Sequence, residues 1–146
     1  MAKLHLDMDL ECDFELYGIG THIGAHRLAW ELNRLFSWEL VYDKELMSFC
    51  RNKGEHVSAH IVYSFRKIEE EIDVSLVLNR VPEGCLTVGH GPNSLDYLLK
   101  VNSGSVDIDR VIQTIRTSKL VTLVTSLDPV KSGVLEAMFE LELKEK

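Results

Sequence analysis

The stretch that decides the fold is residues 4–16, Leu-His-Leu-Asp-Met-Asp-Leu-Glu-Cys-Asp-Phe-Glu-Leu. Apolar and polar side chains alternate along it, with the apolar ones at even positions. Because successive side chains of a strand point to opposite faces of a sheet, this period of two is typical of a strand with one buried face and one face in water. The stretch exceeds the usual strand length of about 5–6 residues. It therefore predicts two strands, or one strand that bends near residues 11–13.

Helical spacing appears twice in the sequence. Residues 17–20 lead to a turn, and Thr21 is the expected N-cap of a helix that spans about Ile23–Phe36. On one side of that helix lie Ile23, Arg27, Trp30 and Arg34. Beside that side is an apolar stripe, which consists of Leu28, Leu32, Leu35 and Phe36. A second helix is expected from Asp107 to about Thr117, with Val111, Ile112 and Ile115 as its apolar residues.

Strands account for most of the remaining chain. They are expected at residues 38–42, 57–66, 72–79, 95–101 and 120–126, with the second and third joined as an antiparallel pair by residues 66–71. Residues 43–55 and 80–94 read as loops, the second with a possible short strand at 85–88. The tail from Pro129 fits a helix and a strand equally well.

This order of elements predicts the fold class. We expect residues 1–146 to form a single α+β domain, a mixed, mainly antiparallel sheet with two helices on one face. A ferredoxin-like βαββαβ core with an inserted hairpin is the alternative.

Charge and composition exclude several kinds of partner and location. The net charge of −7 is spread along the chain and no Lys/Arg run exceeds two residues, so we expect no nucleic acid partner. No apolar run approaches the ~20 residues that span a bilayer, and the first residues lack the apolar core of a signal peptide. The cysteines Cys12, Cys50 and Cys85 form no CxxC pair, which favours free thiols and a cytoplasmic location.

Histidines are the first candidates for chemistry. His22 and His26 stand four apart, the spacing that can place two imidazoles on one helix face. His90 lies in the glycine-rich stretch Gly89–Ser94, whose backbone N–H groups could bind an anion. No third metal ligand stands at a sensible spacing from the first two, and no recognisable catalytic constellation occurs, so we expect neither metal nor cofactor and leave enzymatic activity open.

Two charged residues stand among apolar neighbours. Arg27 lies beside Leu28 and Trp30, and Asp96 lies between Leu95 and Tyr97. Because an unpaired buried charge is costly, we predict that Arg27 and Asp96 are partners that link the first helix to the strand at 95–101. The alternative is that Arg27 lays its stem along Trp30 and keeps its charged head in water. The ligand-contacting candidates are therefore His22, His26, Arg27, His90 and Asp96.

Two segments resemble a known family. Ile19 through Asn33, with Gly18 before it, is similar to the N-terminal β–α unit of the IPExxxVDY family of Bacteroidota, and Val121 through Lys131 resembles that family's C-terminal strand and turn. Leu95-Asp96-Tyr97 fits the end of the namesake motif, whereas Gly89-His90-Gly91 stands in place of Ile-Pro-Glu. The resemblance implies a short, intracellular bacterial protein and supplies no catalytic residues.

The functional prediction is a non-enzymatic binding or protein-interaction module. The alternative is a small enzyme or ligand-binding protein that uses His22, His26 or His90. The partner is either another protein or a second copy of the chain in a homodimer, because residues 4–16 and the apolar tail at 135–143 both read as sheet edges, which invite strand pairing.

Overall fold

The computed structural model describes residues 14–49, 57–81, 84–87, 95–102, 108–131, 133–134 and 138. The elements, in chain order, are β1 (Phe14–Thr21), α2 (Ala25–Phe36), β2 (Val41–Phe49), β3 (Val57–Lys67), the 3₁₀ turn η1 (Ile68–Glu70), β4 (Ile72–Leu78), β5 (Arg80–Val81), β6 (Gly84–Cys85), β7 (Tyr97–Asn102), α3 (Ile108–Arg116) and β8 (Val121–Leu127). The predictions for residues 4–13, for Asp107, for the Gly89–Ser94 stretch with His90 and for the tail at 135–143, apart from Met138, lie outside the described residues.

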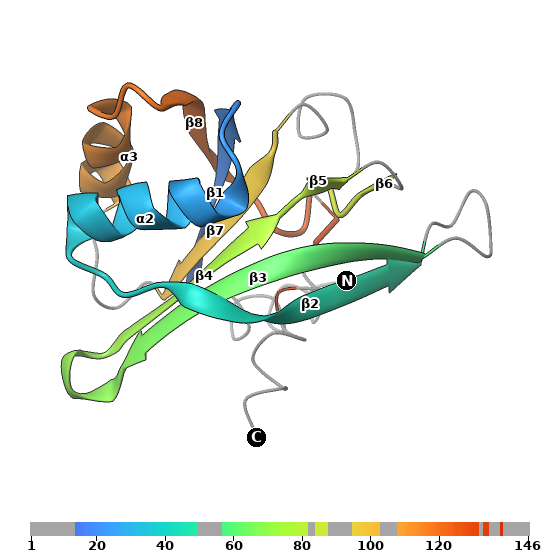
Figure 1. Ribbon diagram of the computed structural model, residues 1–146, viewed down its shortest axis with the longest axis horizontal. Helices are drawn as coiled ribbons and strands as arrows, with labels where there is room; N and C mark the ends of the chain where they lie inside the picture. Colours follow the sequence, from blue (N-terminus) through green and yellow to red (C-terminus); the bar gives the residue numbers. More distant parts are fainter. Residues whose placement is uncertain are drawn as a thin grey trace, which may run out of the picture.

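One antiparallel sheet organises these elements (Figure 1). Its six strands follow the order β2-β3-β4-β7-β1-β8, and β5 pairs with β6 in a small hairpin. The α+β class with two helices on one face is confirmed, and every described strand pair is antiparallel rather than mixed. Without β2 and β3, the order β1-α2-β4-β7-α3-β8 matches the βαββαβ alternative, with β2 and β3 as the inserted hairpin.

Apolar side chains cover the sheet on both faces. Both helices lie on the same face (Figure 1), where Leu28 of α2 and Ile115 of α3 pack in one cluster with Ile19 of β1. On the opposite face, Leu16 of β1 packs in a second cluster with Met138, which follows β8 in the chain. The sheet is therefore the middle layer of the structure, and its central strands are buried on both sides.

Strand β1 differs from the prediction. The alternating pattern ends at Leu16, but the strand continues through Tyr17 to Gly20, and the residues after Leu16 are buried on both faces. The reason is position, because β1 lies between β7 and β8 and is covered on each side. The glycines do not mark a turn: a Cβ at Gly18 would lie 2.2 Å from Cδ1 of Leu95. Residues 14–16, the described part of the edge that the homodimer prediction assumed, lie inside the sheet, and residues 4–13 lie outside the described residues.

Strand β2 also differs from the prediction. A strand was expected at residues 38–42 and a loop at 43–55, but the strand runs from Val41 to Phe49. Its register against β3 shifts between Tyr42 and Lys44, so Asp43 forms a bulge that interrupts the alternation of apolar and polar residues. Because β2 is the edge of the described sheet, its charged residues at 43–45 are compatible with a strand although they resemble a loop in the sequence.

The other predicted elements agree with the structure within a few residues. The α2 helix begins later than expected, at Ala25, with Gly24 as its N-cap and no side-chain cap. Thr21 therefore does not cap the helix and instead ends β1. The expected apolar stripe is buried or partly buried against the sheet, as predicted.

We predict that Gly18→Ala destabilises the protein by about 1–3 kcal/mol, because the added methyl overpacks the contact with Leu95 in a filled core. Urea unfolding measures this loss. Gly24→Ser is the matched control: nothing lies within 4 Å of a Cβ at Gly24, and serine is a better N-cap than glycine. Equal losses in both variants would show that close packing is not what requires glycine at position 18.

Candidate functional site

The carboxylate of Asp96 lies where three segments meet. Its Oδ2 accepts a hydrogen bond from the backbone N–H of Thr21 at 2.9 Å, and its Oδ1 accepts one from Nη2 of Arg80 at 2.9 Å. The hydroxyl of Thr21 in turn donates to the carbonyl of Leu120, just before β8. Asp96 is half-buried, and these bonds give it a role in holding the end of β1 in place.

Tyr97 anchors the same connection one residue further along. Its hydroxyl donates to the carbonyl of Ile23 at 2.9 Å. Burial, together with the negative charge of Asp96 and the neighbouring Tyr63, raises the pKa of Tyr97 to about 12. The phenol therefore stays protonated at neutral pH and continues to donate. The consecutive residues Asp96 and Tyr97 thus bind the end of β1 and the connection between β1 and α2, respectively.

The predicted pair of Arg27 and Asp96 is not formed. Asp96 pairs with Arg80 instead, and Arg27 lies exposed on α2. The error has a physical cause: residues beside Arg27 in sequence are apolar, but α2 turns that position away from the sheet. Arg27 therefore needs no buried partner.

Glu31 forms a second polar cluster, on the inner side of α2. Its side chain is only 4% exposed and accepts two hydrogen bonds from Arg34, at 3.1 Å from Nε and 2.8 Å from Nη2. The bonds from Arg34 and from Ser118, with the charges of Arg34 and Arg27, lower the pKa of Glu31, and they outweigh the opposing effect of its burial. Ser118 follows α3, so Glu31 links the two helices. The spacing of three residues signals the pair with Arg34, but nothing in the sequence signals Ser118.

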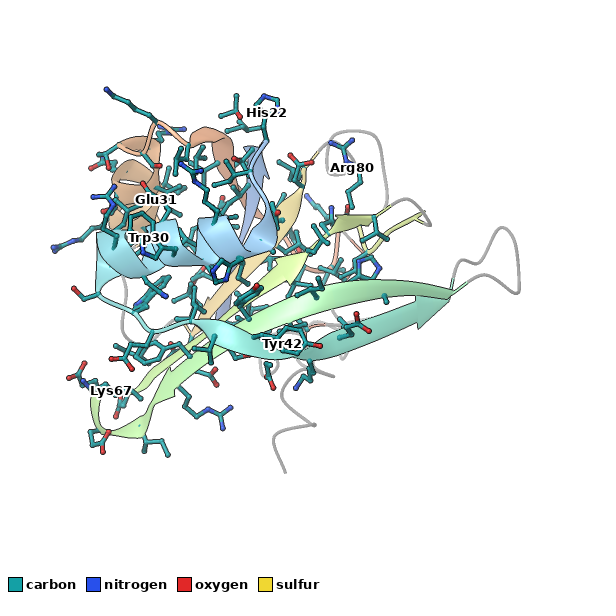
Figure 2. The ribbon with its side chains drawn as sticks, in the orientation of Figure 1. His22, Trp30, Glu31, Tyr42, Lys67 and Arg80 are labelled. Carbon is teal, nitrogen blue, oxygen red and sulfur yellow. The ribbon has the colours of Figure 1, made fainter. Side chains whose placement is uncertain are left out.

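The outer face of α2 presents an unusual side chain. Trp30 is 59% exposed, whereas Trp38, which stacks on Phe36 with ring centroids 4.3 Å apart, is only 7% exposed. His26, Arg27 and Arg34 are exposed as well, and each stands three or four positions from Trp30. Such positions are neighbours on a helix surface. We call this set, His26, Arg27, Trp30 and Arg34, the α2 face; Figure 2 shows Trp30 on the helix beside Glu31.

The histidine candidates are not brought together as a helical pair. His22 is exposed in the connection before α2, near the end of β1 (Figure 2), and His26 lies within the helix, so the four-residue spacing does not place both on one helix face. Among the residues that the structure describes, no group of three His, Cys, Asp or Glu could hold a metal ion. In the same residues, no helix has both the length and the apolar character needed to cross a membrane.

A shallow pocket of about 250 Å³ lies where β2 meets β3. Its lining residues are Val41, Tyr42, Asp43, Ser64, Phe65, Arg66 and Asp73. None of the predicted ligand-contacting residues lies there. Ser64 donates to Asp43 at 2.9 Å, and Arg66 pairs with Asp73 at 3.0 Å. Because these polar groups already bind one another, the α2 face is the stronger candidate.

We predict that Tyr97→Phe lowers the free energy of unfolding by about 1 kcal/mol, the usual net contribution of one hydrogen bond. The ring is kept, so the loss reports the bond to the carbonyl of Ile23. Denaturant unfolding measures it. Tyr42→Phe is the control, because the Tyr42 ring is 57% exposed and should lose almost nothing. A Tyr97→Phe variant as stable as the wild type would contradict the anchoring role.

A second prediction concerns pH. The folded-state pKa of Glu31 lies below the ordinary value of 4.5, so the unfolded chain takes up the proton first as the pH falls. The stabilisation from Glu31 is therefore present above pH 4.5 and is lost as the pH falls through the lowered pKa. We expect Glu31→Gln to be less stable than the wild type at neutral pH, with the difference shrinking in acid.

Urea unfolding across that pH range tests this expectation. Glu39→Gln, at an exposed position after α2, serves as the control and should follow the wild type throughout. A difference between Glu31→Gln and the wild type that stays constant into acid would mean that the charge of Glu31 does not contribute.

A scan of the chain against protein-family models found no match, and searches of the curated proteins and of the solved structures found none either. The functional proposal therefore rests on features of this chain alone. Three of them are on its described surface or close to it: the polar cluster at Asp96, the buried Glu31 that joins the helices, and the α2 face with Trp30. The first two have structural roles, which leaves the α2 face as the candidate site.

Proposed function

We propose that this chain is a non-enzymatic, intracellular protein-interaction module that binds an acidic segment of another protein through the α2 face. The observation that carries the proposal is the exposure of Trp30, which is 59% accessible on the outer side of a helix. Tryptophan and arginine are the residues most enriched at the energetic centres of protein interfaces. A tryptophan can bury about 150–250 Å² of surface on binding, so this one offers a large anchor.

The core of the protein does not require Trp30. Leu28, Ala29 and Leu32 already fill the inner side of α2. The outer position gains little in folding from a large apolar ring, since more than half of the area of Trp30 remains in contact with water. A binding partner that covers the ring buries the area of Trp30 that folding leaves exposed.

Local charge supports an acidic partner. Arg27 and Arg34 flank Trp30, and Arg116 is exposed at the end of α3, two residues before the Ser118 that bonds to Glu31. The only acidic residue of α2, Glu31, is buried beneath the face and paired with Arg34. This surface is basic in a chain whose net charge is −7. A short acidic segment meets only this local surface, whereas a long nucleic acid is also repelled by the remaining acidic residues.

The bonds around Glu31 support binding by a preformed surface. They fix Arg34 on α2 and hold α2 against the end of α3. A surface that is already ordered loses less conformational entropy on binding.

The alternative of an enzyme or ligand-binding protein that uses His22, His26 or His90 has no comparable support among the described residues. Membership of the IPExxxVDY family remains a proposal.

The test uses a short peptide rich in glutamate and leucine as the probe. We expect it to bind the wild type and to shift the fluorescence of Trp30, because the ring leaves water. Trp30→Ala should weaken binding roughly 30-fold or more, as expected for an interface anchor worth about 2 kcal/mol. Arg27→Glu should weaken it as well, and more strongly at low salt.

Matched controls exclude general effects. Tyr42→Ala removes another exposed ring, 57% accessible, and Lys67→Glu makes the same charge reversal on β3; both should bind like the wild type. A scrambled peptide in which glutamine replaces glutamate tests the charge requirement. Binding that is unchanged in Trp30→Ala, or a single-stranded oligothymidine that binds this face better than the acidic peptide, would overturn the proposal.

A further inference from the structure

The two edges of the sheet differ in chemistry. Among the described strands, β2 ends the sheet on one side and β8 ends it on the other. The β2 edge carries the charged residues Asp43, Lys44 and Glu45 and a bulge. Charges and bulges are the features with which natural edge strands prevent pairing with another chain. The β2 edge is therefore protected against addition of a strand.

The β8 edge lacks those charges, and its own register shift, between Val121 and Leu123, lies near the start of the strand. Its sequence, Val-Thr-Leu-Val-Thr-Ser-Leu, holds no charged residue and no proline, and most of its residues are β-branched or apolar. Leu123, in the middle of the strand, is 48% exposed. An apolar edge strand with high β-propensity is a template for another strand, because the backbone N–H and C=O groups on the side of β8 away from β1 have no strand partner among the described residues.

The charges that flank β8 point to a second copy as the occupant. Lys119 stands two residues before the strand, and Asp128 follows it directly; both are exposed. In a pair of antiparallel β8 strands centred on Leu123, Lys119 of each copy faces Leu127 of the other copy, and in one centred on Val124 it faces Pro129, so in either register Asp128 is one position away. Opposite charges then meet at both ends, whereas a parallel pair would place like charges together. A strand with these flanks is complementary to itself.

We propose that two copies of this chain pair through β8 about a two-fold axis, so that one antiparallel sheet runs through both. A closed, isologous contact of this kind is the commonest form of homo-oligomer. The α3 helix, which packs against Val124, keeps its place on the same face in each copy. Leu123 lies on the opposite face of β8 and becomes covered. This proposal is independent of the one for the α2 face, which lies on another element.

Sedimentation velocity over a range of concentrations tests the pairing. We expect the wild type to reach twice the mass of the chain. Leu123→Lys should raise the dimer dissociation constant at least tenfold, because it places two like charges near the axis, while the monomer tolerates a lysine at an exposed position. Val41→Lys is the matched control: Val41 is 62% exposed on the β2 edge, and its variant should dimerise like the wild type.

A charge swap tests the antiparallel register. Lys119→Asp and Asp128→Lys should each dimerise more weakly, because like charges then meet at both ends. A mixture of the two variants should form heterodimers as tightly as the wild type forms homodimers, since opposite charges are restored at each end. Circular dichroism shows whether each variant is folded.

The outcomes of these experiments distinguish failure of the β8 pairing from failure of the α2 face proposal. A wild type that stays monomeric at every concentration overturns the proposal, as does a dimer that Val41→Lys breaks and Leu123→Lys leaves intact. Failure of the acidic peptide to bind would leave this pairing untouched, and a monomer that binds the peptide would leave the α2 face proposal standing.

Discussion

The Asp96 carboxylate joins segments that lie far apart in the sequence. One oxygen binds the backbone N–H of Thr21 at the end of β1, and the other binds Arg80 after β4. Thr21 also bonds to the carbonyl of Leu120, so the ends of β1, β7 and β8 are fixed relative to one another. The α2 helix begins only four residues after Thr21. The direction in which it leaves the sheet, and therefore the side on which Trp30 lies, is set at this junction.

Elements with an unbroken period were predictable from the sequence. The α3 helix and the strands β7 and β8 lie where their apolar patterns placed them, and the apolar stripe of α2 packs inward as expected. Prediction failed where packing requires a residue of a type that is also typical of loops. Gly18 is small because Leu95 occupies the space beside it, and Asp43 bulges from an edge strand. Both facts depend on neighbours that come from distant parts of the chain.

The candidate site was predictable only in part. The grouping of Arg27, Trp30 and Arg34 on one side of α2 follows from helical spacing, and the structure confirms it. That this side faces water does not follow, because an arginine next to a tryptophan fits a buried pair equally well. The true partner of Asp96 is Arg80, which stands at the start of a segment that reads as an irregular loop. Only the antiparallel pairing of β4 with β7 brings these two residues together.

The two proposed surfaces have a joint consequence. The α2 face lies on the helix layer, and the β8 edge lies at the end of the sheet, so occupation of one leaves the other accessible. A dimer paired through β8 carries two α2 faces in a fixed relation. A partner with two acidic segments could then bind both, and the second contact forms at a high effective concentration. Avidity of this kind can raise the apparent affinity by about 10²–10⁴ without any new contact, provided that the spacing of the segments matches that of the two faces. Modest binding of one acidic segment by a single α2 face is thus compatible with tight binding of two linked segments by the pair.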